Sequence, residues 1–196
     1  MHSRNLFMRR FSLLCTAAIL AGTVLWGPCL RRDVLRWRYP QKYAAIVQHW
    51  SKVYGVDPLL IYTVVRTESS FNPTACSHVD ARGLMQITEE TFLWIKSQIA
   101  PNETILFGDL YDPEVNIRFG SYYLQRCLSR YHNDIRTAAA AYHSGWGTVD
   151  ALLKTAAYSD NGESLRVFPY CQMKNYVAKI SGAYAKYQLI YPPEGA

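Results

Sequence analysis

One carboxylate stands at the end of an apolar stretch, and its residue type and position suit it to acid catalysis. Glu68 follows a run of mainly aliphatic residues. If the run is helical, the residues three, four and seven positions earlier on the same face are Val65, Val64 and Ile61. Aliphatic surroundings hydrate a carboxylate poorly and raise its pKa, so Glu68 can hold a proton near neutral pH and donate it. The alternative is a structural acid that pairs with Arg66 or caps its neighbours.

Four blocks of sequence favour the catalytic interpretation, because in this order they resemble a known enzyme family. They are Glu-Ser-Ser-Phe-Asn-Pro at 68–73, Gly-Leu-Met-Gln-Ile at 83–87, Ala-Tyr-His-Ser-Gly-Trp-Gly at 141–147 and Phe-Pro-Tyr-Cys-Gln-Met-Lys-Asn-Tyr-Val at 168–177. From about residue 43 to about residue 187 the chain resembles the soluble lytic transglycosylase (SLT) domain, a bacterial peptidoglycan-cleaving family. The resemblance implies an all-α, goose-lysozyme-like fold with at most a short β-hairpin.

The reaction that this resemblance implies needs one acid. Glycosidic hydrolysis commonly uses two carboxyl groups, but the nearest other acid, Asp80, lies in a predicted loop without apolar surroundings, so we interpret it as structural. The resemblance implies that Glu68 protonates the β-1,4 oxygen between N-acetylmuramic acid and N-acetylglucosamine. The carboxylate then accepts the proton of the muramoyl 6-hydroxyl as a 1,6-anhydro ring closes. A hydrolase of the same fold and a non-catalytic peptidoglycan-binding module of a cell-envelope assembly are the alternative functions.

Three polar side chains are the first candidates for substrate binding. By resemblance, Ser77 lies near the substrate's acetamido group, Gln86 lines the glycan cleft, and Tyr142 holds the catalytic acid by a hydrogen bond. Each has the hydrogen-bonding chemistry that its role needs. Taken without the resemblance, Ser77 also suits a turn, Gln86 a solvated helix surface and Tyr142 a core position.

Aromatic and sulfur-containing side chains give further candidates for the cleft. Trp146 lies between two glycines, where its ring can be exposed and stack on a sugar, and Met85 and Tyr176 fall inside the family blocks. The family usually has Asn where this chain has His143, and Glu where it has Gln172, which leaves open the subsite preference and the recognition of the peptide stem. A lone His in a loop is more often structural than a second acid–base group.

Neither a metal site nor a disulfide framework is predicted. Asp-Asn-Gly at 160–162 lacks the spacing and the final Glu of a calcium loop, so we expect no metal, and the implied reaction uses no cofactor. Three of the five cysteines, Cys76, Cys127 and Cys171, lie in the expected domain, and an odd number does not define a pairing. One bridge with a free thiol and three buried thiols are both compatible with the sequence.

The positive charge of the chain lies at its N-terminus, which removes the usual reason to expect nucleic-acid binding. The net charge is +6, and residues 1–38 contain seven arginines and one acid, so the remainder is formally neutral. A phosphate-binding face needs clustered positive charge. We therefore expect no nucleic-acid partner. The expected partners are the glycan strands of peptidoglycan and the cytoplasmic membrane, and we expect a monomer.

An uncharged segment at 11–30 has the length of a membrane-spanning helix. About 20 apolar residues cross a hydrocarbon core of roughly 30 Å. A cleaved signal peptide, with secretion of the domain, is the alternative, but the run is long and ends in Trp-Gly-Pro-Cys-Leu rather than a small-x-small site. We predict a transmembrane anchor and basic linker at 1–38, a catalytic domain at 39–190 outside the cytoplasmic membrane, and a tail at 191–196.

Cap residues and apolar spacing predict the series of helices that positions these blocks. Two Asp-Pro pairs combine an N-cap with proline at the first helical position, and Thr88 and Asp134 are further N-caps. Gly145 and Gly147 interrupt an alanine-rich helix. No strand-like alternation is found. Helices are expected over about 43–54, 58–71, 89–98, 113–131, 135–144 and 172–188.

Overall fold

A computed structural model describes residues 33–192 of the chain, and this part contains helices and no β-strand. Its β-type pairing is limited to two isolated bridges, Cys76 with Arg82 and Arg82 with Ile87. The all-α prediction, which allowed at most a short hairpin, is confirmed for the described residues, where a loop with these two bridged pairs takes the place of a hairpin.

The chain divides into two compact units, residues 1–40 and 41–196. In the described part of the first unit, residues 33–38 form a short helix on which Val34 and Trp37 are exposed. No helix within residues 33–192 combines the length and the apolar character needed to cross a membrane. The predicted anchor at 11–30 lies outside the described residues, as does most of the predicted tail.

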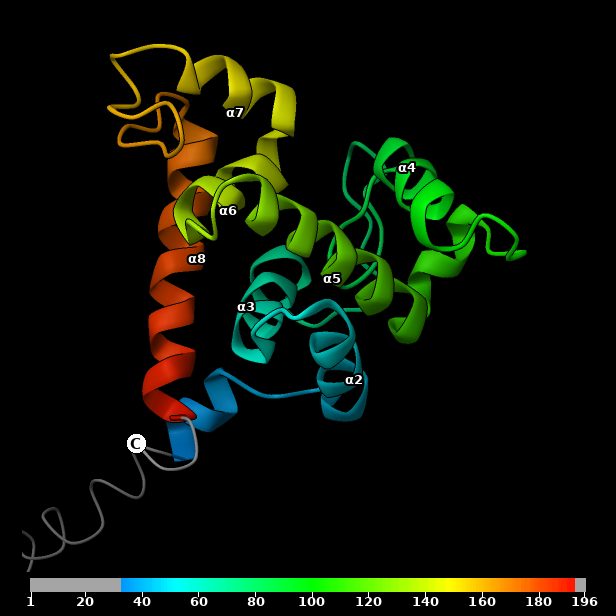
Figure 1. The fold of residues 1–196 in the computed structure, drawn as a ribbon. Coiled ribbons are helices and arrows are strands. Elements are labelled where there is room, and N and C mark those ends of the chain that lie inside the picture. Colours follow the sequence, from blue (N-terminus) through cyan, green and yellow to red (C-terminus); the bar gives the residue numbers. More distant parts are fainter. Residues whose placement is uncertain (1–32, 193–196) are drawn as a thin grey trace, which may run out of the picture. The chain divides into compact units, whose positions relative to one another are not determined.

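The described part of the second unit, residues 41–192, contains seven α-helices and a short 3-10 helix, η1. Figure 1 shows how the helices are arranged. Two long loops, at 70–88 and 154–170, interrupt the series, and the first of them carries the Gly-Leu-Met-Gln block. In chain order the elements are α2 (Ala44–Tyr54), α3 (Pro58–Ser69), α4 (Glu89–Ile99), η1 (Phe107–Tyr111), α5 (Pro113–Arg130), α6 (Ile135–Ser144), α7 (Trp146–Leu153) and α8 (Cys171–Ile190).

Local signals in the sequence explain where four of these helices begin. The Asp57 carboxylate accepts a hydrogen bond from the Leu59 N–H at 2.8 Å, and proline follows it at the first position of α3. Asp112 caps α5 in the same way, by accepting from two N–H groups of the first turn. Thr88 and Asp134 each accept from the N–H three residues later. These four predicted N-caps are confirmed.

The helix ends near the site are set by left-handed backbone. α3 ends at Ser70, which has a φ of 52°, slightly earlier than predicted. Gly145, with a φ of 81°, ends α6 as expected. The sequence did not predict α7, which begins at the very next residue. Its buried Val149 and Leu152 give this short helix an apolar side, but one too short to stand out as a periodic pattern.

The packing of the helices brings distant parts of the chain together, and α8 lies beside both α3 and α6 (Figure 1). α3 contacts α2 and α8, and its residues 60–65 are buried. α6 packs against α5 and α8 through buried alanines at 138–141, as predicted for small residues that allow close approach. The ends of α3 and α6, one turn of α8 and the loop at 70–88 therefore meet at one place.

The three cysteines of the described residues are free thiols. Cys127 is buried, whereas Cys76 and Cys171 are exposed. Neither arrangement considered from the sequence is observed: there is no bridge among the three, and only one of them is buried.

Candidate active site

Glu68 lies in the last turn of α3, with its carboxylate directed at α8. Its Oε1 accepts a hydrogen bond of 2.6 Å from the Tyr176 hydroxyl. The aliphatic residues that the sequence placed on its face, Ile61, Val64 and Val65, are all buried. Burial raises the pKa of Glu68 from 4.5 to about 7, and the bond from Tyr176, which favours the charged form, opposes this only in part. The raised pKa agrees with the expectation from the sequence.

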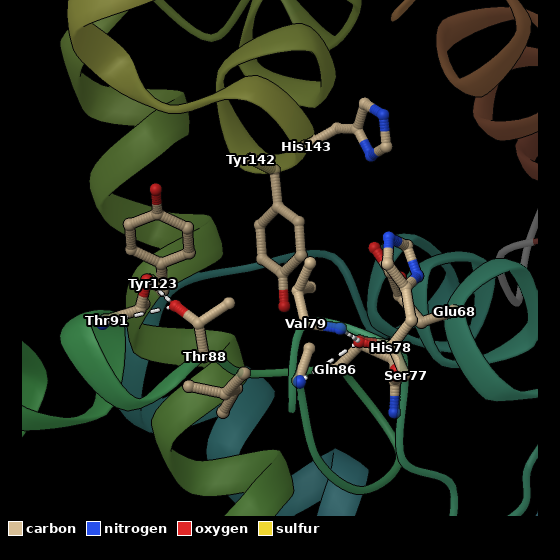
Figure 2. Close-up of a pocket in the computed structure, with 12 residues that line it drawn as sticks. Glu68, Ser77, His78, Val79, Gln86, Thr88, Thr91, Tyr123, Tyr142 and His143 are labelled. Atoms are coloured by element: carbon tan, nitrogen blue, oxygen red, sulfur yellow. Dashed lines mark hydrogen bonds between the residues drawn. The ribbon is translucent and has the colours of Figure 1, made fainter. Parts of the chain in front are cut away.

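A cavity of about 260 Å³ opens in front of this carboxylate (Figure 2). One wall is formed by the loop at 77–88, and α4 and α5 contribute Thr91 and Tyr123. Tyr142 and His143, from the end of α6, close another side. Among the residues that line this cavity, Glu68 is the only acid.

Ser77 and Gln86 both reach the cavity wall, and both also hold the loop in shape. The Ser77 hydroxyl oxygen accepts from the N–H groups of Val79 at 3.3 Å and Ala81 at 3.1 Å, so the turn role and the place in the cavity wall coexist. Gln86 has a left-handed φ of 50°, and its amide Nε2 donates to the carbonyls of Gly83 at 2.9 Å and residue 75 at 3.2 Å. It therefore lies in a structured turn and not on a solvated helix.

The expected hydrogen bond between Tyr142 and Glu68 is replaced by one from a different tyrosine. Tyr142 lines the cavity, but its hydroxyl donates to the Met85 carbonyl at 2.9 Å. Tyr176 makes the bond to the acid, because α8 packs along α3 and carries this hydroxyl to the last turn of α3. Tyr176 is almost completely buried, so it contacts the carboxylate from the side of the protein core and does not line the cavity.

Two other candidates lie away from the Glu68 cavity. The Met85 side chain is fully buried in the core beside Gly120, and of this residue only the carbonyl takes part in the site, so its expected place in the cleft wall is wrong. Trp146 begins α7, and its indole N–H lies 3.2 Å from the Cys127 sulfur. Its ring lines a neighbouring cavity instead of the one in front of Glu68.

The structure separates the two other titratable candidates. Asp80 is exposed and paired in bidentate fashion with Arg82, at 2.9 Å for both contacts, and this lowers the pKa of its carboxyl group. It is therefore not a proton donor near neutral pH. His143 lines the cavity and stacks on Tyr176, with ring centroids 4.5 Å apart at 12°. Desolvation, assisted by Lys179, lowers the pKa of His143 and favours the neutral ring.

No group of three His, Cys, Asp or Glu residues suited to a metal ion is found within residues 33–192. The absence of a metal from the working protein stays a prediction.

Comparison with known proteins accounts for this arrangement. The family model described as the transglycosylase SLT domain matches residues 45–163, more than half of the chain. The chain belongs to this family. The SLT-domain chain is similar to membrane-bound lytic murein transglycosylase C of Edwardsiella ictaluri, with 30% identity over 177 residues, 76% of this chain and 47% of the relative. Soluble lytic murein transglycosylase of Salmonella typhimurium is 28% identical over 95% of this chain and 28% of its own length. The chain thus spans about half, or less, of these relatives.

Solved structures of the SLT family share the fold. The 70 kDa soluble lytic transglycosylase from Escherichia coli aligns with a TM-score of 0.72 and 28% identity, over 96% of this chain and 30% of that one. An inactive Glu-to-Gln mutant of the lytic transglycosylase Slt from Pseudomonas aeruginosa aligns with a TM-score of 0.69 and 28% identity, over 79% of this chain and 25% of that one.

The SLT blocks have a physical reason to occur together, because hydrogen bonds join them. The hydroxyl of Ser69, next to Glu68, donates to the Leu84 carbonyl at 2.8 Å. The Met85 carbonyl accepts from Tyr142 in the third block, and the fourth block provides the tyrosine that bonds to the acid. The family motif is therefore one connected support around the carboxylate.

Asn116 completes this support, and it is not among the site residues predicted from the sequence. Its side chain is fully buried on α5 and accepts from the Met85 N–H at 2.8 Å. The amide nitrogen donates to the carbonyls of Arg82 at 3.0 Å and Leu110 at 2.8 Å. A Cβ on Gly83 would lie 2.1 Å from this nitrogen, which explains why the block begins with glycine. The sequence signal that could have identified Asn116 was its amide side chain among the apolar positions of α5.

Proposed function

We propose that this chain is a peptidoglycan lytic transglycosylase, which cleaves the β-1,4 bond between N-acetylmuramic acid and N-acetylglucosamine without water and leaves 1,6-anhydromuramoyl ends. The observation that carries the proposal is the lone carboxyl group of Glu68, whose pKa of about 7 allows it to donate and then to accept a proton. The names of the relatives support the same activity. So does the inactive Glu-to-Gln mutant among the similar structures.

The reaction follows from one acid used twice. Protonated Glu68 gives its proton to the glycosidic oxygen as the bond to the muramoyl C1 breaks, and the neighbouring acetamido oxygen stabilises the positive charge at C1. The carboxylate then takes the proton of the muramoyl 6-hydroxyl, whose oxygen bonds to C1 and closes the anhydro ring. The acid is restored, and neither water nor a cofactor is consumed. Tyr176 keeps its hydrogen bond to the carboxylate while the charge is present.

The polar residues of the cavity wall are proposed to bind the sugar. Ser77 and Gln86 stand on the loop that faces Glu68 and offer hydroxyl and amide groups to the acetamido substituent and the ring hydroxyls. Tyr142 contributes a ring wall to the same cavity, and its hydroxyl ties this wall to the turn that carries Met85 and Gln86.

Digestion of purified sacculi tests the reaction and separates it from hydrolysis. Wild-type protein is expected to release muropeptides with 1,6-anhydro ends, seen by mass spectrometry as products one water lighter than hydrolysis products. Glu68→Gln is expected to lower the rate by about 10³-fold or more, since the amide keeps the shape of the side chain and loses the transferable proton. Products with only reducing ends would instead show a muramidase.

A non-catalytic binding role is the rival from another class. A Glu68→Gln variant that binds glycan and restores full cellular function would favour it. Loss of cellular function together with retained glycan binding is the result that our proposal predicts.

We further propose that the domain works on the outer side of the cytoplasmic membrane as a monomer, anchored by residues 11–30. The uncharged run of spanning length and the membrane-bound relatives support this location. Fractionation of cells is expected to recover the full-length chain with membranes, and protease added from outside is expected to degrade the domain. Recovery in the medium of a shorter protein that lacks residues 11–30 would show a cleaved signal peptide.

A further inference from the structure

His143 connects the wall of the Glu68 cavity with the tyrosine that supports the acid. It lies in the last turn of α6 and lines the cavity in front of Glu68 (Figure 2). Its imidazole also stacks on the ring of Tyr176, with centroids 4.5 Å apart at 12°. Tyr176 in turn donates the hydrogen bond of 2.6 Å to the Glu68 carboxylate. A series of contacts therefore runs from His143 through Tyr176 to the acid.

The stacked imidazole holds the tyrosine ring in place. The two rings are in contact, yet His143 is exposed and lines the cavity, whereas Tyr176 is only 7% exposed and does not line it. The imidazole therefore covers Tyr176 on the side of the cavity. A nearly parallel ring pair at this separation restricts the tilt of the tyrosine ring. Because the hydroxyl stands at the end of that ring, the stack also determines where the hydroxyl points, and with it the bond to Glu68.

Two of these three groups can change their protonation near neutral pH. Burial raises the pKa of Tyr176 well above its ordinary value of 10, so this residue stays a hydrogen-bond donor. Desolvation, assisted by the charge of Lys179, lowers the pKa of His143 from its ordinary value of 6.5. The imidazole is therefore neutral in the range where Glu68, with a pKa of about 7, begins to hold its proton.

The groups described around His143 offer its protonated form one acidic neighbour, which is Glu68. The other titratable side chains that line the cavity are neutral or basic: His78 of the loop, Tyr123 of α5 and Tyr142 of α6. α8 contributes Tyr176 and the basic Lys179. α7 also packs on α6, but its Asp150 is already paired with Arg130 and Tyr131 of α5 and the following residue. A charge on His143 therefore acts mainly on Glu68 and on whatever occupies the cavity.

A positive charge on His143 opposes both steps of the proposed reaction. As the glycosidic bond breaks, positive charge develops at the muramoyl C1, and an imidazolium in the cavity wall repels it. After the proton transfer, the imidazolium stabilises the Glu68 carboxylate and makes it a weaker base toward the 6-hydroxyl. The neutral ring has neither effect.

We propose that His143 is a positioning residue that holds Tyr176 against Glu68 while its ring is neutral and slows cleavage when its ring is protonated. The effect of the charge rests on the proposed function, whereas the positioning of Tyr176 depends on the ring contact alone. The enzyme then works in a pH window that Glu68 limits from above and His143 from below. Asn, which the family usually has at this position, does not titrate, so the lower limit is a feature of this chain.

Two variants separate the ring of His143 from its charge. His143→Phe keeps a ring that can stack on Tyr176 and cannot be protonated, whereas His143→Ala removes both. The wild type is expected to show a low-pH fall in kcat/KM on soluble glycan strands, with a midpoint below 6.5, and both variants are expected to lose it. Near neutral pH, kcat of His143→Phe is expected to exceed that of His143→Ala by about tenfold, because only the phenyl ring still holds Tyr176.

His78→Phe is the matched control. His78 is also exposed and lines the same cavity, but it stands on the loop at 70–88, so this variant is expected to keep the low-pH fall. Every variant receives the same substrate, so titration of the substrate affects all of them alike. An NMR titration of the His143 ring in the wild type needs no variant and is expected to give the midpoint of the low-pH fall.

Three results would overturn the inference. A low-pH fall that persists in His143→Phe, or an NMR midpoint that differs from that of the rate, would show that another group causes the fall. Equal kcat values for His143→Phe and His143→Ala would show that the ring does not position Tyr176.

Failure of the inference and failure of the proposed function are distinguishable. If wild-type protein releases anhydro products while His143→Phe keeps the low-pH fall, the function stands and the role of His143 is wrong. If the fall disappears in His143→Phe but wild-type protein releases only reducing ends, the role of His143 stands and the transglycosylase reaction is wrong.

Discussion

Glu68 owes its suitability as an acid and base to two opposing effects on one carboxyl group. Burial among aliphatic side chains raises its pKa, and the hydroxyl of Tyr176 lowers it by bonding to the carboxylate. Burial is the larger effect and leaves the pKa at about 7. A group that must release and recover a proton in each cycle works best near this value at neutral pH. The rate is therefore expected to fall as the pH rises above about 7, because only the protonated form can begin the proposed reaction.

Tyr176→Phe is expected to move this alkaline fall in rate to higher pH. Loss of the hydroxyl removes the bond that favours the carboxylate, so the pKa of Glu68 rises further, by about one unit for a charge-assisted bond. The rate below the pKa is also expected to fall, since the acid loses the contact that orients it. The pH dependence of kcat/KM on soluble glycan strands measures both effects.

Tyr142→Phe is the matched control for this prediction. The Tyr142 hydroxyl bonds to the Met85 carbonyl and not to Glu68. Its removal leaves that carbonyl without this partner and is expected to cost about 1–3 kcal/mol of stability with little change in the alkaline limb. If both variants shift the alkaline fall in rate equally, the conclusion that Tyr176 alone controls the pKa of Glu68 is wrong.

At the scale of elements, the turn that follows Gly83 determines how α3, α5 and α6 support the site. Asn116 fixes its backbone from α5, and the buried Met85 packs where Gly120 leaves room on the same helix. A Cβ at Gly120 would lie 2.3 Å from the Met85 sulfur and 2.8 Å from its Cβ. The close approach of α5 to this turn therefore depends on a glycine inside a helix, where glycine is otherwise unfavourable.

Gly120→Ala is accordingly expected to destabilise the protein by about 1–3 kcal/mol, as overpacking does, and to reduce activity by displacing the Met85 carbonyl from Tyr142. Gly182→Ala is the matched helix substitution with free space, and it is expected to stabilise by up to about 1 kcal/mol. Urea unfolding of the two variants measures the difference. Equal effects of the two substitutions would show that α5 and the turn can move apart without loss of stability.

The same elements show what the sequence could predict. The N-caps at Asp57, Thr88, Asp112 and Asp134 were predictable because each depends on residues within one turn. Which tyrosine bonds to Glu68 depends on how α8 packs on α3. Tyr176 follows Glu68 by 108 residues, so no local sequence pattern predicts this hydrogen bond.

Among the candidate site residues, too, some could be predicted from the sequence and others depend on how the helices pack. The acid Glu68 follows from its residue type and its place after an apolar run, whereas Ser77 and Gln86 were candidates through the family resemblance. All three line the cavity. The burial of Met85 against α5 and the position of Trp146 over a second cavity are consequences of packing. Sequence spacing could not distinguish a side chain that lines the cleft from one that supports it from behind.

For the molecule as a whole, the raised pKa of Glu68 links the active site to global stability. Folding raises this pKa from 4.5 to about 7, so between these values the folded state holds a proton that the unfolded state has lost. The free energy of unfolding therefore falls as the pH rises through this window, and the full penalty is present above about pH 7. Below about pH 4.5 the group is protonated in both states and the penalty vanishes.

Glu68→Gln is thus expected to be more stable than the wild type at pH 8, by about 1–3 kcal/mol given that the side chain keeps some exposure, and similar to it at pH 4. Urea unfolding of both proteins at these two pH values measures the difference. Glu103→Gln provides a control of opposite sign, because the hydrogen bonds from Arg118 lower the pKa of Glu103. That variant is expected to lose stability at pH 8 and to lose less at pH 4. Should Glu68→Gln show the same stability as the wild type at pH 8, the carboxylate is not desolvated in the folded protein, and its role as a proton donor near neutral pH fails with it.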